Sequence, residues 1–372
     1  MPKFNFLECL PRVLWHFVDR LFLIKTTPEK QGGTCIIRVG GIGDMILSIP
    51  LLSGLRFNGK KTTLVCDDKH KCIEFILDKH VDDIFYYNKN KLKNNILYRL
   101  TTIRKLKSKG FEEVIHSGIS RQQGGADVLA WACSASKTIG FYPRAWNHCE
   151  IVISNKWFNQ LINGHYNDIH EIERMDIIAK SVGCNPGEYR AQNTSQTDSI
   201  FIVCIGTSSP VREWGIDKFI STAEKLKTTT GFMPVFVGEE KDLKQFPTHV
   251  GYDHINLIGK TTFNELYNLI AKSKFIITND SSPMHIGVLL NIPTIAIVSG
   301  GEYNSYCHYP EKYNKNLLTI SSDDKSCYNC GWDCVYKKPD NTPFPCLSSI
   351  SVEDAISSII IWPKMKQLID IE

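Results

Sequence analysis

A glycine-rich turn ending in a carboxylate follows the first β-branched run of the chain. Residues 35–39, Cys-Ile-Ile-Arg-Val, lead into Gly40-Gly41-Ile42-Gly43-Asp44 and then into a helical pattern. Glycines let the backbone approach a ligand closely, and Asp44 follows the carboxyl end of the expected strand. A carboxylate in that place can act as a general base on a hydroxyl group. The alternative, slightly favoured by the pattern alone, is that Asp44 is the N-cap of the following helix.

A second polar turn lies in residues 275–285, Phe-Ile-Ile-Thr-Asn-Asp-Ser-Ser-Pro-Met-His. The pattern predicts a strand, a turn and a helix with Ser282 as its N-cap. The N–H groups and the dipole at such a helix start can bind an anion such as a diphosphate. We expect Asp280 to hold sugar hydroxyls and His285 to lie near the bound phosphate. For a single histidine at this spacing, a structural hydrogen bond is the commoner role.

Two further turns carry charged side chains. Arg212 ends the turn Gly206-Thr207-Ser208-Ser209-Pro210-Val211-Arg212, and its guanidinium could neutralise a phosphate. The alternative is a surface arginine that pairs with Glu213. Glu239 and Glu240 follow another strand candidate, where a carboxylate can accept hydrogen bonds from a ribose, although either glutamate could simply be exposed.

Four of the thirteen cysteines cluster near the C-terminus, as Cys327-x2-Cys330-x3-Cys334-x11-Cys346. This spacing is compatible with a structural four-thiolate zinc site, and disulfides or free thiols are the alternatives. The other nine cysteines are scattered, which is typical of buried free thiols in a reducing compartment. We therefore expect a cytoplasmic protein.

Composition excludes several classes of protein. The 372 residues are 42% hydrophobic and 22% charged, as in an ordinary globular chain, and the length predicts about two domains. The net charge of +4 is too small to indicate a nucleic-acid polymer as partner.

The elements that must position these turns alternate as in parallel α/β proteins. Strands are expected at residues 35–39, 62–65, 113–116, 138–141, 200–205, 234–237, 255–258, 275–278 and 294–298. Helices are expected at 45–55, 69–79, 93–107, 126–133, 216–227, 262–271 and 283–290, and Pro50 should kink the first of them.

We predict two Rossmann-like, doubly wound parallel-sheet domains that face a central cleft. The first covers residues 34–192, and the polar segment 193–199 begins the second, which extends to residue 350. An N-terminal extension, residues 1–33, precedes them, and a C-terminal helix at 351–372 follows. The missing dinucleotide fingerprint disfavours a nucleotide-dependent oxidoreductase.

Residues 4–24 predict an amphipathic helix. Its apolar face includes Val13, Phe17 and Leu21, whereas Arg12 and Asp19 fall on the opposite face with other polar residues. Charged residues interrupt the stretch, so it is neither a membrane-spanning helix nor a signal peptide. The helix docks either on its own protein or in a membrane interface, and the second would place the chain on the cytoplasmic face of the inner membrane.

Together these segments resemble glycosyltransferase family 9, the ADP-heptose:lipopolysaccharide heptosyltransferases, which have the GT-B fold. Five matching pieces occur in family order from residue 34 to the C-terminus. They are Ile37-Arg38-Val39-Gly40-Gly41-Ile42-Gly43-Asp44 with Ser48-Ile49-Pro50 and Leu55-Arg56, Lys137–Phe141, His170–Arg174, Asn256–Thr261 and Asn279–His285. The family also carries a proline at the place of Pro50.

The resemblance implies inverting, metal-independent transfer of a sugar from a nucleotide diphosphate donor, with ADP-heptose favoured, to a glycan or lipid-linked acceptor. It makes Asp44 the catalytic base and Arg212 the group that stabilises the leaving diphosphate. The implied donor site includes the side chains named above together with flanking backbone. These donor-site residues are Gly43, Thr207, Ser208, Glu239, Glu240, Asp280, Ser281, Ser282, Met284 and His285.

The chain departs from the family pattern in several places. Arg212 stands where lysine is usual, Ser282 replaces a glycine, and Ser299-Gly300-Gly301-Glu302 replaces a glycine-proline-threonine turn. His116 occupies a strand end where an acid is common, and we expect it to bind the acceptor with Arg121; a solvated Arg121 is the alternative. These departures keep a second function open, that of a non-catalytic nucleotide-sugar-binding protein of the same fold.

Overall fold

A computed structural model describes residues 17–20, 32–121, 123–142, 154–163, 169–189, 198–322, 326–336 and 338–369. The chain divides into two compact units. Unit 1 comprises Met1–Tyr166 and Ile172–Glu188, and unit 2 comprises Asn167–Glu171 and Tyr189–Glu372. Residues 193–197 of the polar segment 193–199 and most of the N-terminal extension lie outside the described residues.

Unit 1 is built on a parallel sheet of six strands in the order β3-β2-β1-β4-β5-β6. The strands are β1 (Thr34–Ile37), β2 (Thr62–Asp67), β3 (Asp83–Tyr87), β4 (Glu113–His116), β5 (Lys137–Phe141) and β6 (Gln160–Ile162). The central strands β1 and β4 are fully buried. Strands β3 and β6 were not expected, because β3 is half exposed and β6 is a three-residue edge strand, so neither has a buried β-branched run.

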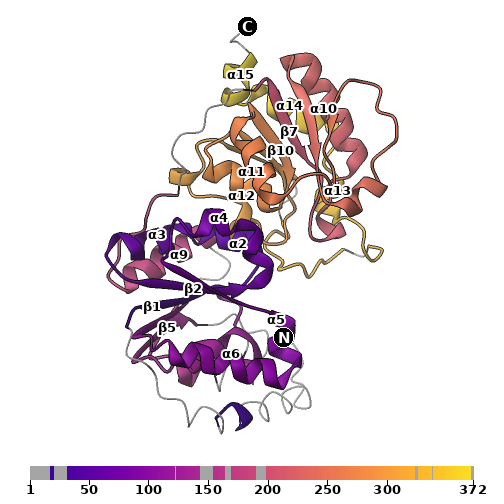
Figure 1. The fold of residues 1–372 in the computed structure, drawn as a ribbon. Helices are drawn as coiled ribbons and strands as arrows, with labels where there is room; N and C mark the ends of the chain where they lie inside the picture. The colour runs from indigo at the N-terminus through magenta and orange to yellow at the C-terminus, as the bar shows by residue number, and fades with distance from the viewer. Residues whose placement is uncertain are drawn as a thin grey trace. The chain divides into compact units, whose positions relative to one another are not determined.

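Helices cover both faces of this sheet, with α2, α3, α4 and α9 on one face and α6 on the other (Figure 1). They are α2 (Ile42–Leu47), α3 (Ile49–Phe57), α4 (Glu74–Leu77), α5 (Lys89–Asn94), α6 (Ile96–Ser108), α7 (Val128–Ala132) and α9 (Glu171–Ser181). The expected helices at 45–55 and 93–107 are each divided into two α-helices, and the one expected at 69–79 is a 3-10 helix followed by α4. Ser48 separates α2 from α3, with Pro50 in the first turn of α3, where proline is well tolerated. Asn95 separates α5 from α6 and caps α6 by accepting a hydrogen bond from the Tyr98 N–H.

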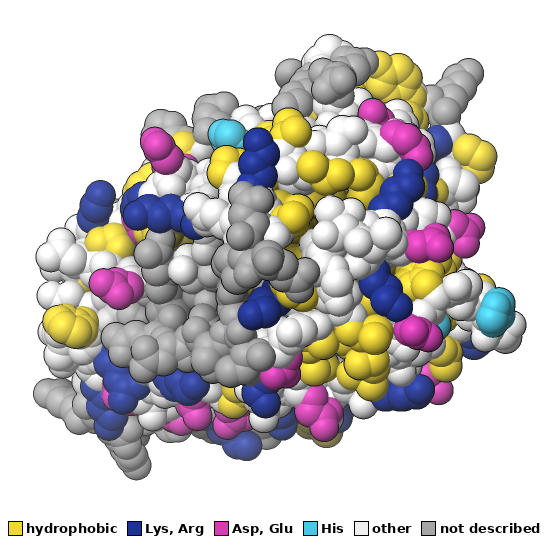
Figure 2. Space-filling model, turned by 90° about the horizontal axis from the view of Figure 1, so that it is seen from above, with side chains coloured by type: hydrophobic (Ala, Val, Ile, Leu, Met, Phe, Trp, Pro, Cys, Tyr) yellow, Lys and Arg dark blue, Asp and Glu magenta, His cyan; other side chains and the backbone are white. Residues whose placement is uncertain are grey.

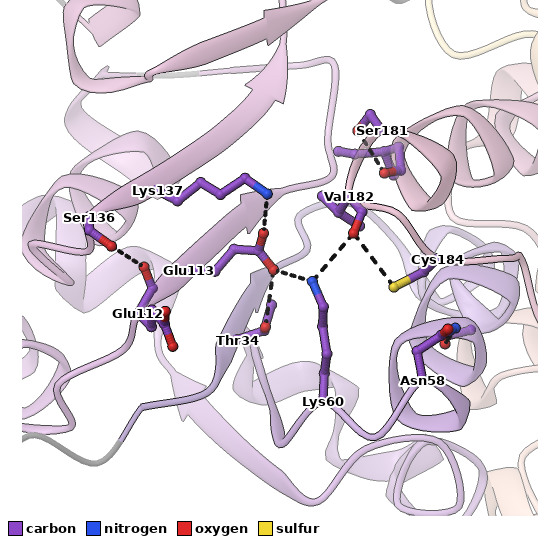
Figure 3. A network of polar contacts seen from close by, with 12 residues as sticks. Thr34, Asn58, Lys60, Glu112, Glu113, Ser136, Lys137, Ser181, Val182 and Cys184 are labelled. Atoms are coloured by element: carbon purple, nitrogen blue, oxygen red, sulfur yellow. Dashed lines mark hydrogen bonds and ion pairs between the residues drawn. The ribbon is translucent and has the colours of Figure 1, made fainter.

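A buried carboxylate ties the amino ends of three strands together (Figure 3). Glu113 at the start of β4 bonds Lys137 of β5 and Lys60 just before β2, each at 2.8 Å, and accepts a hydrogen bond from Thr34 of β1. Burial raises the pKa of Glu113, but the hydrogen bonds and charges of Lys137 and Lys60 outweigh it, so the pKa lies below its ordinary value. This network lies at the sheet edge opposite the carboxyl ends of the strands.

Residues 17–20 are helical and are anchored to unit 1 by a buried ion pair. Both carboxylate oxygens of Asp19 accept hydrogen bonds from Arg99 of α6, the closest at 2.6 Å, and Asp19 is fully buried. Phe17 is 61% exposed. At these residues, therefore, the predicted polar face contributes a buried side chain, Asp19, whereas the predicted apolar face contributes an exposed one, Phe17.

Unit 2 repeats the architecture. Its parallel sheet has the order β12-β11-β10-β7-β8-β9. The strands are β7 (Ile200–Cys204), β8 (Met233–Val237), β9 (Ile255–Asn256), β10 (Phe275–Asn279), β11 (Thr294–Ile297) and β12 (Leu317–Ile320). The helices are α10 (Ile216–Thr230), α11 (Phe263–Lys272), α12 (Ser282–Leu289), α13 (Pro345–Ser348), α14 (Val352–Ile361) and α15 (Pro363–Ile369). The C-terminal helix expected at 351–372 is divided because Trp362 is extended before Pro363.

The core of unit 2 is aromatic and aliphatic. Phe201 and Phe275 stack on neighbouring strands with their ring centroids 4.7 Å apart, and Trp214 packs edge-on against Phe219 of α10. Helix α14 closes this core with Ala355 and Ile359. Among the described helices, none is both long and apolar enough to span a bilayer. Positive and negative side chains are interspersed on the face seen in Figure 2, without a broad single-sign patch.

Both sheets have the same strand order, counted from the first strand of each unit. The order reverses between β1 and β4 in unit 1 and between β7 and β10 in unit 2, and ligands of open α/β sheets bind outside the carboxyl ends of strands at such a switch point. Asp44 follows β1, Thr207 and Ser208 follow β7, and Asp280 follows β10. The topology therefore brings the predicted site residues of each unit to its switch point.

Candidate functional site

In unit 1, Asp44 is held by an arginine that the sequence reasoning did not single out. Arg38 follows β1 and is 1% exposed, whereas the Asp44 side chain is 20% exposed. Arg38 Nη2 lies 3.1 Å from Asp44 Oδ1, its Nε donates to the Asp44 carbonyl, and its Nη1 donates to the Ser117 carbonyl after β4. One buried guanidinium thus spans the switch point and fixes the carboxylate. The available signal was a charged residue within an otherwise apolar run.

Asp44 is not the N-cap of α2. The N-cap is Gly41, and Asp44 occupies the third helical position, from which its Oδ2 accepts a hydrogen bond from the Gly41 N–H at 2.7 Å. Gly40 has φ 127°, and a Cβ there would collide with the Asp44 carboxylate. The glycine turn therefore exists to let this carboxylate fold back over the helix start. Gly43 is itself a helical residue of α2.

The predicted acceptor residues His116 and Arg121 are buried. All five N–H donors of Arg121 are used, on Asp127, the Phe141 carbonyl, Asn155 and Ser154. A solvated Arg121 is therefore excluded, and the guanidinium has no donor left for an acceptor. His116 is fully buried 3.4 Å from Asp127, and burial lowers its pKa to about 4 although Asp127 opposes the shift. We read both residues as internal supports of unit 1.

In unit 2, Asn279 bridges the switch point. Its side-chain amide donates to the Ile205 carbonyl after β7 and accepts from the Trp214 N–H, at 2.8 and 2.9 Å. This fixes both ends of the loop that carries Arg212. The Arg212 guanidinium donates to Ser208 Oγ and lies 3.8 Å from Asp280 Oδ2, with no ion pair to Glu213 among the described contacts. The alternative of an Arg212–Glu213 pair is wrong.

Asp280 is the buried member of this pair. Its side chain is 8% exposed and that of Arg212 is 25% exposed. Burial raises the pKa of Asp280, and the positive charge of Arg212 opposes the shift. The guanidinium is therefore the group that reaches the surface, as a phosphate-binding residue requires.

Helix α12 begins one residue earlier than expected. Ser281 is the N-cap, Ser282 is the first helical residue and Pro283 the second. Ser281 and Ser282 are half-buried at this helix start. Met284 is fully buried, and its N–H donates to the Ser281 carbonyl. The Met284 side chain therefore belongs to the core in this structure, and the groups suited to binding an anion at this helix start are the serine N–H groups.

His285 is buried against tyrosines rather than free at the surface. Its Nδ1 lies 2.6 Å from Tyr309 Oη, and Tyr189 Oη donates to the His285 carbonyl. Burial, aided by the charge of Arg212, lowers the pKa of His285 to about 3, so the ring is neutral at physiological pH. His285 can position the helix start or offer a neutral nitrogen, but it carries no positive charge for a phosphate. Neither tyrosine has a periodicity signal that would have revealed it in the sequence.

The two glutamates predicted to bind a ribose are exposed. Lys241 lies 3.1 Å from the Glu239 carboxylate and donates to the Thr207 carbonyl, which links the loops after β7 and β8. Thr207 Oγ1 accepts a hydrogen bond from the Ser209 N–H within its own turn. Glu240 is exposed beside Glu239. The carboxylate of Glu239 is thus anchored by one lysine and remains open to a ligand.

The four clustered cysteines are free and all line one cavity. Gly300 N–H points to Cys346 Sγ at 3.4 Å. Burial raises the pKa of Cys346, and the neighbouring thiols add to that shift. The donor set suits a thiolate-bound metal. Within the described part of the chain, however, no group of three or more His, Cys, Asp or Glu side chains is close enough together to hold a metal ion.

Comparisons with known proteins agree with the fold and the expected resemblance. Residues 175–333 match the sequence model of glycosyltransferase family 9 (heptosyltransferase). Lipooligosaccharide heptosyltransferase 2 of Haemophilus influenzae is 35% identical over 95 residues, which are 24% of this chain and 27% of that protein. The aligned part is thus about a quarter of that relative's length.

Solved structures extend the similarity to nearly the whole chain. The family 9 glycosyltransferase from Veillonella parvula has a TM-score of 0.69 at 20% identity, covering 94% of this chain and 100% of that one. ADP-heptose LPS heptosyltransferase II of Escherichia coli has a TM-score of 0.63 at 15% identity, covering 91% and 98%. The predicted GT-B fold and the family resemblance are both confirmed.

Proposed function

For a chain that resembles glycosyltransferase family 9 and shares the fold of its solved members, we propose inverting transfer of a sugar from a nucleotide diphosphate donor. The favoured donor is ADP-heptose or a close relative, and the acceptor is a hydroxyl of a surface glycan or lipid-linked glycan. One observation supports it most. Unit 1 presents a fixed carboxylate at its switch point, and unit 2 presents a guanidinium beside a free helix start at its own.

Asp44 is suited to accept the proton of the acceptor hydroxyl. Arg38 donates a hydrogen bond to one carboxylate oxygen of Asp44 and the Gly41 N–H donates to the other, so the side chain is held in a fixed orientation. As the proton moves to Asp44, the hydroxyl oxygen attacks the anomeric carbon from the face opposite the diphosphate. The bond from that carbon to the diphosphate oxygen breaks, and the electron pair leaves with the nucleotide.

Unit 2 stabilises the charge that develops on the departing diphosphate. Arg212 offers its fixed positive charge, and the N–H groups of Ser281 and Ser282 at the start of α12 follow directly after its partner Asp280. Asp280 is placed to accept hydrogen bonds from sugar hydroxyls, and Glu239 from a ribose. No step of this chemistry uses a metal ion.

A donor and turnover screen tests this function. ADP-, GDP-, UDP- and dTDP-sugars are added to the full chain, thermal unfolding identifies the ligand that binds the folded state, and released nucleotide reports transfer to truncated glycan acceptors. We expect ADP-heptose to raise the melting temperature most. Stabilisation by a donor without nucleotide release across a broad acceptor panel supports instead the non-catalytic binding protein, which the departures at Arg212 and Ser282 favour.

We also propose that unit 1 contacts the anionic surface of the inner membrane. Phe17 is 61% and Leu97 74% exposed, and the Asp19–Arg99 ion pair brings their two helices together. Besides the buried Arg99, residues 84–111 contain seven Lys or Arg and no Asp or Glu, and the exposed cations include Lys93 and Lys105. Exposed apolar side chains among cations are typical of membrane-surface helices.

Vesicle flotation checks the membrane contact. Full-length Phe17→Ser/Leu97→Ser should float less with phosphatidylglycerol vesicles than the wild type, and Phe57→Ser, which changes a 96% exposed side chain of α3, is the matched control. Point variants are preferable to removal of residues 1–31, which would leave the buried Arg99 without Asp19. Equal flotation of all three proteins would remove the membrane proposal.

The four cysteines remain a predicted structural zinc site. A bound ion would draw the thiols lining the cavity into one tetrahedral set and stabilise the segment, without taking part in transfer. Zinc and iron are measured in protein purified without chelator or polyhistidine tag, because thiolates bind both. A metal content near zero would favour free thiols.

A further inference from the structure

The cysteine-rich segment packs on the turn that departs from the family pattern. A Cβ on Gly300 would collide with the ring of Tyr328, and one on Gly301 would collide with the ring of Trp332. The N–H groups of Asn329 and Gly331 donate to the carbonyls of the same two glycines, at 2.7 and 2.8 Å. The paired glycines after β11 are therefore explained by the segment that covers them.

From this position the segment reaches the turn that carries Arg212. The Trp332 ring centroid lies 5.5 Å from the Arg212 guanidinium carbon. Phe344, later in the same segment, packs against Trp332 with ring centroids 5.6 Å apart, and its N–H donates to the Val211 carbonyl at 3.1 Å. The segment thus contacts both the backbone and the side chain of this turn.

Arg212 needs such a support. Within its turn, Arg212 ends a single 3-10 turn of three residues, Pro210–Arg212, and its side chain is 25% exposed. Ser208 and Asp280 hold the guanidinium from one side, and the Asp280 contact is long, at 3.8 Å. An aromatic face restricts a guanidinium without consuming its N–H donors, which stay available to phosphate oxygens.

We infer that Trp332 is a positioning residue for the diphosphate site, and that the cysteine-rich segment holds Arg212 in place through Trp332 and Phe344. This inference rests on the proposed role of Arg212. Donor affinity should then depend on whether the four cysteines are free or bound to a metal, because Trp332 lies between Cys330 and Cys334 and lines the same cavity as the thiols. The segment is then part of the donor site although no cysteine touches the donor.

Isothermal titration with ADP and with adenosine tests the role of Trp332. We expect Trp332→Ala to weaken ADP binding about 3- to 30-fold, the range of a cation–π contact, and to leave adenosine binding unchanged. Trp332→Phe keeps an aromatic face and should retain most of the affinity, which also guards against misfolding of the alanine variant. Val335→Ala, a 72% exposed position in the same segment, is the matched control.

A double variant separates this inference from the proposed function. If Trp332 acts through Arg212, Trp332→Ala should change ADP affinity less than twofold in an Arg212→Ala background. Equal losses for ADP and adenosine, a full additive loss in the double variant, or wild-type affinity in Trp332→Ala would overturn the inference alone. An Arg212→Ala protein with wild-type ADP affinity, or a wild type that binds none of ADP, GDP, UDP and dTDP, would overturn the proposed function and the inference with it.

Discussion

The two switch points carry the same ion-pair chemistry with the burial reversed. In unit 1 the arginine is buried, at 1% exposure, and the aspartate is 20% exposed. In unit 2 the aspartate is buried, at 8%, and the arginine is 25% exposed. Each pair includes an arginine from the loop after the first strand of its unit, β1 or β7, and lies at the carboxyl ends of the strands. Both sheets have the strand order 3-2-1-4-5-6.

This reversal means that the side chain accessible to a ligand is the aspartate in unit 1 and the arginine in unit 2. The buried partner compensates charge and fixes geometry, and the half-exposed partner is left to react or bind. In the proposed function, unit 1 accordingly offers a carboxylate to the acceptor hydroxyl, and unit 2 offers a cation to the diphosphate of the donor. The proposed division between acceptor chemistry and donor binding thus follows which partner of each pair is exposed, and not the presence of the pair.

Replacing the exposed carboxylate should give the largest effect. Asp44→Asn keeps an oxygen for Arg38 but cannot take a proton, so kcat should fall about 10²- to 10⁴-fold while ADP affinity is unchanged. Nucleotide release measures the first and calorimetry the second. Asp78→Asn, at an exposed position of unit 1, is the control. A kcat within tenfold of the wild type would show that another group takes the proton.

Replacing the exposed cation should act on affinity. Arg212→Ala should weaken ADP binding about 10- to 100-fold, the usual worth of a hydrogen bond to a charged group. Arg212→Lys introduces the residue usual in the family pattern. Its ADP affinity should lie between those of the wild type and Arg212→Ala, because lysine keeps the charge and loses the bidentate geometry. Lys225→Ala, a surface lysine of α10 paired with Glu353, is the control. An alanine variant that loses kcat but keeps ADP affinity would contradict the division between the units.

The exposed members of both pairs could be predicted from the sequence, and their buried partners only in part. Asp44, Arg212 and Asp280 stand in turns after β-branched runs, where short-range pattern suffices. The role of Arg38 depends on Ser117, 79 residues away, and no local rule carries that contact. The burial of Arg121 and His116 could not be predicted for the same reason, because their neighbours Asp127 and Ser154 come from other segments.

The fold was more predictable than the site because strand and helix periods are local. Strand Glu113–His116 has the expected bounds, whereas the helix breaks at Ser48 and Asn95 depend on single capping residues. The reason for glycine at positions 300 and 301 could not be predicted from neighbouring residues. The rings of Tyr328 and Trp332, which leave no room for a Cβ there, lie about 30 residues further along the chain.

Replacing Asp280, the buried carboxylate of unit 2, should have a smaller effect. It should raise the stability of the fold and weaken the binding of an ADP-sugar. Because burial raises the pKa of Asp280 above its unfolded value, ionisation at neutral pH costs folding free energy, and that cost disappears as the pH falls through the folded pKa. Asp280→Asn should therefore melt at a higher temperature than the wild type at pH 7, with a smaller difference at pH 5. Its affinity for an ADP-sugar should fall about 2- to 10-fold, with little change for ADP. A lower melting temperature at pH 7 would mean that the pair with Arg212 outweighs burial.

The amino edge of the unit 1 sheet should give the smallest effect on transfer. Glu113 joins β1, β4 and β5 through Lys60, Lys137 and Thr34, at the edge opposite Asp44 (Figure 3). Its folded pKa lies below the ordinary value of 4.5, so its ion pairs stabilise fully above that pH and lose their effect as the pH falls through the folded pKa.

Glu113→Gln should therefore lower the stability of unit 1 by about 1–3 kcal/mol at pH 7, since it breaks a largely buried pair, and by less at pH 3.5. Urea unfolding followed by circular dichroism at the two pH values measures this, with the exposed neighbour Glu112→Gln as the matched control. Transfer activity at 25 °C should stay within twofold of the wild type in both variants. A loss of kcat in Glu113→Gln as large as that in Asp44→Asn would contradict the proposal that the reaction takes place at the carboxyl ends of the unit 1 strands. A carboxylate at the opposite ends of the same strands would then matter equally.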